Sequence, residues 1–173
     1  THRDFAPEIK EVMEKEQAEN MIVVCIDAVS RLDCSYYVNS PVTGNWQDFI
    51  TDDVVSYLDK NYRTIDKQSA RGLVGHSVGG FGVLNAALNT EGTFSHFYAS
   101  SPAIFDNKGF EKANIPFEAL EALCEPYWEM DPKAAQKAYL ETLENETANA
   151  MYSYSSAFAY DVDLNAPYIA VPE

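Results

Sequence analysis

Residues 71–82, Arg-Gly-Leu-Val-Gly-His-Ser-Val-Gly-Gly-Phe-Gly, decide the fold prediction for this chain. They join a short apolar run to the pattern G-x-S-x-G at residues 75–79. The pattern alone is a weak signal, but its surroundings predict a strand before it, a helix after it and another strand about twenty residues on. Strand, helix and strand in this order form a βαβ unit, which favours an α/β fold with a parallel sheet.

Ser77 is the candidate nucleophile in this context. A nucleophilic serine must stand on a sharp, strained strand-to-helix turn, and glycines beside it let strand and helix approach closely. The helix predicted to start at about Val78 directs its first amides toward a developing oxyanion, so the Val78 amide is the predicted donor. A purely structural tight turn is the alternative reading. The other predicted residues of the turn are Gly75, His76, Gly79 and Gly80.

A serine nucleophile needs a base within hydrogen-bond reach, and none of the three histidines fits that role. His76 is adjacent to the serine and should point away from the attacked side. His2 begins the first helix, and His96 starts a strand at the end opposite the expected site. Elbows of this kind place their acid and histidine later in the chain, in that order. We therefore expect the base to lie outside this chain segment.

The remaining segments alternate between helix and strand patterns. Helical spacing covers residues 5–13, 46–58 and 81–88, and strand patterns cover 21–26 and 96–99. Asn45 and Asp48 are suitably placed to cap the second helix. Residues 107–160, approximately, show helical patterns and little strand signal, which predicts a helical insertion over the carboxyl edge of the sheet. The prediction is one domain over residues 1–173, a mostly parallel sheet with helices on both faces.

The composition is that of a globular protein, with 46% hydrophobic and 23% charged residues. A formal net charge of −15 disfavours binding to nucleic acid. No apolar run is long enough to cross a bilayer. The three cysteines are too far apart for a metal knuckle, and Cys25 is predicted to be a small buried hydrophobe in its strand. We expect neither a metal nor an organic cofactor, and the compartment stays open.

Five stretches resemble the putative esterase family, the relatives of esterase D in the α/β-hydrolase superfamily. They are residues 21–27, 35–41, 44–46, 62–64 and 71–82. That family includes S-formylglutathione hydrolases, feruloyl and acetyl-xylan esterases and mycolyltransferases. Val78 stands where the family usually has Met, a conservative change for a position that contributes mainly its amide.

The resemblance implies hydrolysis of a carboxylic ester through an acyl-serine intermediate on Ser77, with a small-molecule or carbohydrate-linked ester as substrate. It implies that the loop holding Tyr36, Tyr37 and Trp46 borders the pocket, core packing being the other reading for Trp46. Ser101, after a predicted strand, either lines that pocket or forms the loop. The resemblance also implies truncation at both ends, with the second oxyanion donor before residue 1 and the triad acid and histidine after residue 173.

Two other functions stay open. One is acyl transfer to a sugar or other alcohol at the same site, which a competing alcohol acceptor would reveal. The other belongs to a different class: a non-catalytic module of the hydrolase fold that binds a ligand or partner. The oligomeric state does not follow from the sequence.

Overall fold

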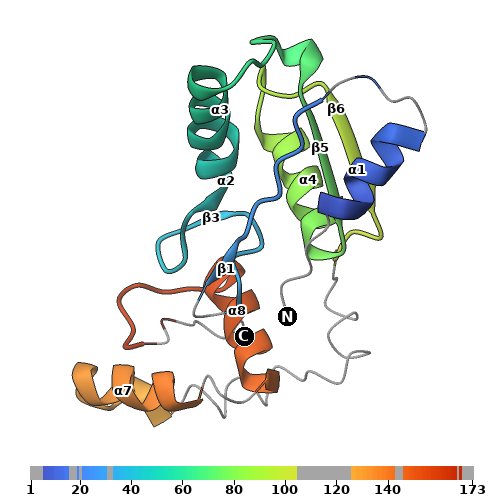
Figure 1. The fold of residues 1–173 in the computed structure, drawn as a ribbon. Coiled ribbons are helices and arrows are strands. Elements are labelled where there is room, and N and C mark those ends of the chain that lie inside the picture. Colours follow the sequence, from blue (N-terminus) through green and yellow to red (C-terminus); the bar gives the residue numbers. More distant parts are fainter. Residues whose placement is uncertain are drawn as a thin grey trace.

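The computed structural model describes residues 6–15, 19, 21–30, 33–104, 126–142, 146–166 and 168 of the 173-residue chain. Its elements follow one another as Figure 1 shows. The helices are α1 (Ala6–Lys15), α2 (Trp46–Asp48), α3 (Val55–Asn61), α4 (Val78–Asn89), α7 (Pro132–Thr142) and α8 (Glu146–Phe158), with a π-helical turn at Phe49–Val54 and a 3-10 turn at Gln68–Ala70. The strands are β1 (Val29–Ser30), β2 (Asp33–Cys34), β3 (Asn39–Ser40), β4 (Gly44–Asn45), β5 (Gly72–His76) and β6 (His96–Ser100). Across the described ranges, no helix is both long and apolar enough to cross a membrane.

The predicted βαβ unit is present as β5, α4 and β6. The two strands are parallel and pair from Gly72 with His96 to His76 with Ser100. Helix α4 packs against both strands, and Figure 1 shows it beside them. This confirms the strands and the helix predicted around Ser77.

The wider sheet differs from the prediction within the described residues. Three two-stranded sheets are present, of which β5–β6 is parallel and β1–β2 and β3–β4 are antiparallel. Opposite α4, the side chains of Val74 and Tyr98 are 79% and 64% exposed. Helix α1 buries none of its residues. Helices on both faces of the parallel sheet, as predicted, are therefore not found in the part of the chain that the structure describes.

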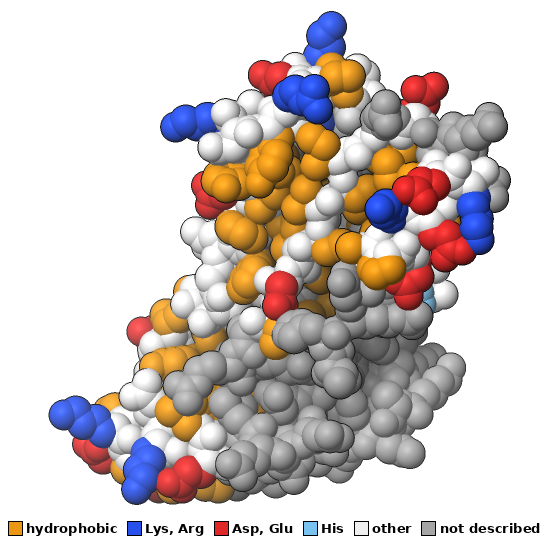
Figure 2. Space-filling view, viewed as in Figure 1, with side chains coloured by type: hydrophobic (Ala, Val, Ile, Leu, Met, Phe, Trp, Pro, Cys, Tyr) orange, Lys and Arg blue, Asp and Glu red, His pale blue; other side chains and the backbone are white. Residues whose placement is uncertain are grey.

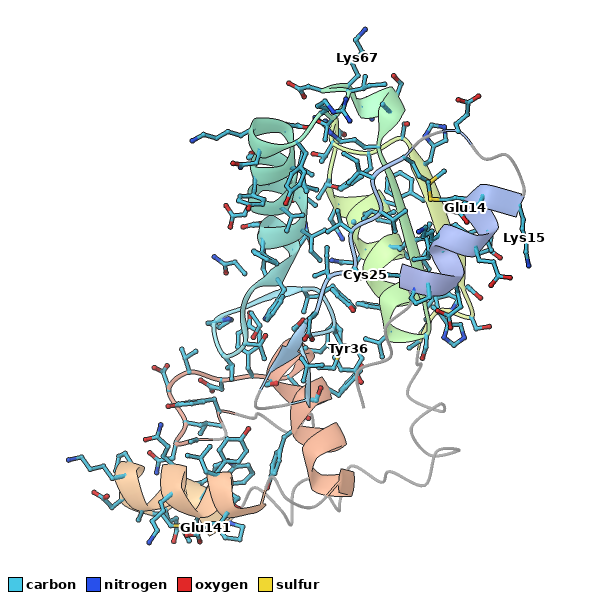
Figure 3. All side chains as sticks on the ribbon, in the orientation of Figure 1. Glu14, Lys15, Cys25, Tyr36, Lys67 and Glu141 are labelled. Carbon is cyan, nitrogen blue, oxygen red and sulfur yellow. The ribbon has the colours of Figure 1, made fainter. Side chains whose placement is uncertain are left out.

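The prediction of a buried strand at residues 21–26 is wrong. The segment is not assigned to a strand, and its residues from Met21 to Val24 are 44–55% exposed. Cys25, labelled in Figure 3, is also exposed rather than buried. An apolar run becomes a buried strand only when a neighbouring strand pairs with it and other elements cover it. No described strand pairs with this segment.

A cavity of about 870 Å³ lies between this segment, α3 and the start of β5. Apolar side chains from all three parts line it, among them Ile22, Val24, Val54, Leu58 and Leu73. Figure 2 shows hydrophobic side chains gathered over this part of the molecule. The apolar run thus borders an open groove instead of a closed core.

The amphipathic helix predicted at 46–58 forms as α2, the π-helical turn and α3 in succession. Its predicted cap is wrong, because the side chain of Asn45 makes no capping hydrogen bond. The Oδ1 atom of Asn39 instead accepts hydrogen bonds from the backbone N–H of Gln47 at 3.0 Å and of Asp48 at 3.2 Å. A cap supplied from six or more residues upstream is a tertiary feature, so local spacing does not reveal it.

Helix α8 confirms the helical pattern predicted late in the chain, and it packs on β2 and β3. Buried serines hold it there. Ser153 Oγ donates to the Cys34 carbonyl at 2.7 Å and accepts from the Cys34 N–H at 3.2 Å. Ser40 Oγ donates to the Ser156 carbonyl at 2.5 Å. The insertion boundaries near 107 and 160 stay a prediction, since residues 105–125 lie outside the described ranges.

Candidate active site

Ser77 lies on a sharp turn between the last residue of β5 and the first of α4. Its backbone has φ 54° and ψ −118°, a conformation that costs a non-glycine residue energy. Its N–H donates to the Ser100 carbonyl at 3.0 Å, and its carbonyl accepts from the Ala103 N–H at 2.9 Å. These two bonds tie the turn to the end of β6 and the loop after it, which is how the strain is sustained.

The hydroxyl of Ser77 is not used to cap α4. Serine at a helix N-cap usually accepts a hydrogen bond from the first turn, but here no side-chain cap bond forms. The residue is exposed. The side chain is therefore accessible to a substrate at the carboxyl end of β5.

Two of the flanking glycines are needed for the close approach of strand and helix. A Cβ on Gly75 would lie 2.1 Å from the carbonyl oxygen of Gly79. A Cβ on Gly80 would lie 3.0 Å from Pro102 Cα and from the Ser100 carbonyl oxygen. At Gly79 a Cβ would meet nothing within 4 Å, so the expectation that this glycine serves close approach is wrong.

Val78, the predicted oxyanion donor, is the first residue of α4. The first amides of a helix have no intrahelical acceptor, and the helix dipole favours negative charge at this end. The Val78 side chain is half-buried, and the Val78 backbone N–H lies directly after Ser77 in the chain. The arrangement is suited to stabilising the oxyanion that forms on the carbonyl oxygen of a substrate when the Ser77 hydroxyl attacks it.

The described histidines are not placed to act on Ser77. Gly75 faces α4, so His76, the next residue of β5, lies on the opposite face of the sheet. His96 pairs with Gly72 at the far end of β5, and its Nδ1 lies 2.8 Å from Ser95 Oγ. His2 lies outside the described residues. Within those ranges, no histidine or carboxylate is hydrogen-bonded to the Ser77 hydroxyl.

The loop before β3 brings Tyr36 and Tyr37 to the first turns of α4, where Tyr36 contacts Phe81 and Tyr37 lies against Gly82. Their role as pocket residues stays a prediction. Both tyrosines have positive φ, 53° and 57°, which is rare for bulky side chains. The ring of Tyr37 lies within 2.9 Å of the place where a Cβ of Gly82 would be, so only glycine leaves room for it. Burial raises the pKa of Tyr37, and the charges of Cys34 and Asp27 add to that effect.

Tyr36 belongs to a set of four aromatic side chains that we call the aromatic cluster: Tyr36, Phe81, Tyr154 and Phe158. The ring centroid of Tyr36 lies 6.3 Å from that of Phe81, 5.5 Å from that of Tyr154 and 5.3 Å from that of Phe158. Phe81 and Phe158 are 5.5 Å apart, and Tyr154 and Phe158 are 4.8 Å apart. Figure 3 shows Tyr36 between the lower end of α4 and α8. Burial raises the pKa of Tyr154.

Sequence reasoning missed three members of this cluster. One signal was available: Phe81 follows Ser77 by four residues, and Phe158 follows Tyr154 by four, so each pair shares a helix face. Trp46 lies elsewhere, with its ring 5.7 Å from Phe49 and its Nε1 donating to the Thr43 carbonyl at 2.8 Å.

Ser101 lies in the loop that is tied to Ser77. It is exposed, with φ 43°, between the two residues whose backbones bond to Ser77. The cavity of about 870 Å³ includes neither Ser77 nor any member of the aromatic cluster. No group of three or more potential metal ligands occurs among the described residues.

Comparison with known proteins gives one family. A search of the curated proteins found no match. The model of the family described as "Putative esterase" matches residues 5–155, which include Ser77 and all of the aromatic cluster except Phe158. This match spans most of the chain and agrees with the strand-turn-helix arrangement at Ser77. The chain therefore belongs to the putative esterase family, an assignment that supports ester hydrolysis as its chemistry and suggests the α/β-hydrolase fold.

Proposed function

We propose that this protein hydrolyses carboxylic esters with Ser77 as the nucleophile, through an acyl-serine intermediate. The observation that carries the proposal is the backbone of Ser77, strained at φ 54° and ψ −118° between β5 and α4. Strain of this kind persists where the surrounding structure imposes it, and it is frequent at catalytic sites. Because the hydroxyl is exposed and makes no cap bond, it is available to attack a carbonyl.

In the proposed first step, Ser77 Oγ attacks the carbonyl carbon of the ester while a base accepts the hydroxyl proton. The carbonyl oxygen becomes negatively charged, and the Val78 N–H donates a hydrogen bond to it. Collapse of this intermediate breaks the bond to the alcohol, which leaves with the proton from the base. Water then attacks the acyl-serine, and the acid is released.

The base must come from residues beyond those described, since His76 and His96 do not reach Ser77. A histidine oriented by a carboxylate is the group that this chemistry usually uses.

The test compares Ser77→Ala with Ser56→Ala, an exposed serine on α3. Release of 4-nitrophenolate from 4-nitrophenyl acetate is measured, and the site labelled by a fluorophosphonate is mapped by mass spectrometry. We expect Ser77→Ala to lower the rate by at least about 10³-fold and to abolish labelling, and Ser56→Ala to change neither. An unlabelled, inactive wild-type protein would instead favour a non-catalytic binding module.

A further inference from the structure

The cavity of about 870 Å³ lies at the opposite end of β5 from Ser77. Gly72 and Leu73, the first two residues of β5, line the cavity, whereas Ser77 follows the last residue of that strand. Its volume is within the range of small-molecule sites, about 300–1,000 Å³. Figure 2 shows hydrophobic side chains open to the surface in this part of the molecule. The cavity is therefore a candidate ligand site that is separate from the candidate active site.

Aliphatic side chains predominate in the lining of this cavity. Ile22 and Val24 border one side, and Val54 and Leu58 border the other. Ile22 and Val24 are 50% and 44% exposed, although removing them from water would be favourable. A flexible alkyl chain that lies along such a surface buries apolar area and needs no polar partner there. The lining therefore favours an alkyl chain as the apolar part of a ligand.

The charges at the cavity favour an anion as the polar part of a ligand. Asp59, Arg63 and Arg71 line the cavity. Arg71 is ion-paired with Asp59 and Asp66, and the side chains of Arg71 and Asp59 are largely buried. Arg63 is exposed and has no ion-pair partner among the described residues. Its guanidinium has the planar set of N–H donors that fits a carboxylate.

The connection from the end of α3 to the start of β5 is basic, unlike the chain as a whole. Residues 60–71 include four of the twelve basic residues and one acidic residue, Asp66, in a chain of net charge −15. Figure 2 shows basic side chains above the hydrophobic surface. A local positive field attracts an anionic ligand, whereas two copies of so acidic a chain repel each other. The charge pattern thus favours an anionic small molecule over a second copy as the occupant.

We propose that this groove binds a single-chain anionic amphiphile, a long-chain fatty acid in its carboxylate form. The alkyl chain lies against Ile22, Val24 and Leu58, and the carboxylate pairs with Arg63. The inference goes beyond the proposed function, because the groove lies at the amino end of β5 and ester hydrolysis at Ser77 does not use it.

The test measures binding of dodecanoate by isothermal titration calorimetry, with each ligand below the concentration at which it forms micelles. Dodecylamine has the same chain with the opposite charge, and hexanoate has the same head group on a shorter chain. We expect dodecanoate to bind at least about 10-fold more tightly than either. Non-specific attraction to a chain of net charge −15 would instead favour dodecylamine, so the order of the affinities separates the two explanations.

Two matched variants test the polar end of the site. Arg63 and Lys67 are both exposed in the connection between α3 and β5, but Lys67 does not line the cavity, and Figure 3 shows it pointing away from the molecule. Arg63→Gln should weaken dodecanoate binding about 3- to 5-fold, as expected for an exposed ion pair, and Lys67→Gln should leave it unchanged. Binding of hexadecane-free dodecanol is not needed for this comparison, because the head group is constant.

A second pair tests the apolar part of the site. Val24→Asn places a polar side chain in the lining, whereas Val12→Asn changes an exposed valine on α1 outside the cavity. We expect Val24→Asn to weaken dodecanoate binding at least about 5-fold and Val12→Asn to leave it unchanged. Circular dichroism shows whether each variant is folded, and the exposed Arg63 supplies the test if Val24→Asn is not.

Equal binding of dodecanoate and dodecylamine overturns the inference, and so does wild-type affinity in both Arg63→Gln and Val24→Asn, which would place the ligand elsewhere. Binding to vesicles that contain phosphatidylglycerol without binding to dodecanoate would assign the groove to a membrane surface. A dimer in sedimentation that does not bind dodecanoate would assign it to a second copy, and either result overturns the inference. None of these measurements depends on turnover at Ser77, so failure here and failure of the proposed function are distinguishable.

Discussion

Gly75 and Gly79 stand two residues before and two residues after Ser77, yet their surroundings differ. The missing side chain at Gly75 leaves room for the Gly79 carbonyl, whereas the position of a Cβ at Gly79 is open. Neither glycine has a positive φ. Gly79 is the second residue of α4, where alanine is a better helix former than glycine. The two glycines should therefore respond in opposite directions to the same substitution.

We expect Gly75→Ala to destabilise the protein by about 3 kcal/mol or to prevent folding, because the contact to backbone cannot be relieved by rotation of a side chain. Gly79→Ala should be neutral or stabilise by about 0.5–1 kcal/mol. Urea unfolding followed by circular dichroism measures both changes. Equal destabilisation by the two substitutions would contradict the geometry of the turn.

At the scale of elements, two asparagines lie near the start of the helical stretch from Trp46 to Asn61, and only one of them caps it. Asn39 Oδ1 accepts from two N–H groups of the first turn, and its Nδ2 donates to Asp48 Oδ1 at 2.7 Å. Asn45, at the N-cap position, makes no such bond. Asn39→Ala should cost about 1 kcal/mol of unfolding free energy, and Asn45→Ala less than about 0.5 kcal/mol. Thermal unfolding by calorimetry provides the comparison, and a larger effect at Asn45 would reject Asn39 as the cap.

Local sequence patterns were sufficient to predict those elements whose hydrophobic period and flanking residues indicate the same type of structure. The apolar stripe at 46–58, the strands beside Ser77 and the helix after it all form. Residues 21–26 show the limit, because their burial depends on a strand partner that local sequence does not specify. Asn39 and Phe158 show the same limit, since each contacts residues outside its own element: Asn39 caps the helical stretch that begins at Trp46, and the Phe158 ring contacts Tyr36 and Phe81. The candidate nucleophile could be predicted, whereas the aromatic cluster could be recognised only from the fold.

At the scale of the whole molecule, an ion-pair network joins α3 to the start of β5. Arg71 bonds to Asp59 and Asp66, and Thr64 Oγ1 donates to Asp59 Oδ1 at 2.6 Å. The Thr64 hydrogen bond, followed by Arg71, lowers the pKa of Asp59 below 3.8, although desolvation opposes the shift. A lowered folded-state pKa contributes stability above the unfolded pKa, and that contribution is lost as the pH falls through the folded value.

Asp59→Asn should therefore destabilise the protein more at about pH 6 than at about pH 2.5, because the stabilisation by the wild-type carboxylate decreases as the pH falls below the unfolded pKa toward the lowered folded pKa. Urea unfolding at the two values measures the difference. Asp53→Asn, in the exposed part of the π-helical turn, is the control and should show a smaller dependence. A constant effect of Asp59→Asn across this range would argue against the network as its cause.

The net charge of −15 acts on the molecule as a whole. The chain has twenty-seven acidic and twelve basic residues, so repulsion among carboxylates opposes the compact state. Salt has two opposing effects here: it screens this repulsion, and it weakens exposed ion pairs, each worth at most about 1 kcal/mol. With many more carboxylates than basic partners, the screening of repulsion should be the larger effect.

Raising NaCl from about 10 mM to about 200 mM shortens the screening length from about 30 Å to below 10 Å and should raise the unfolding temperature by a few degrees. Choline chloride at equal ionic strength should act alike, because screening depends on charge and not on the ion. A fall in unfolding temperature with both salts would mean that the attractive pairs, such as Arg71 with Asp59, outweigh the repulsion.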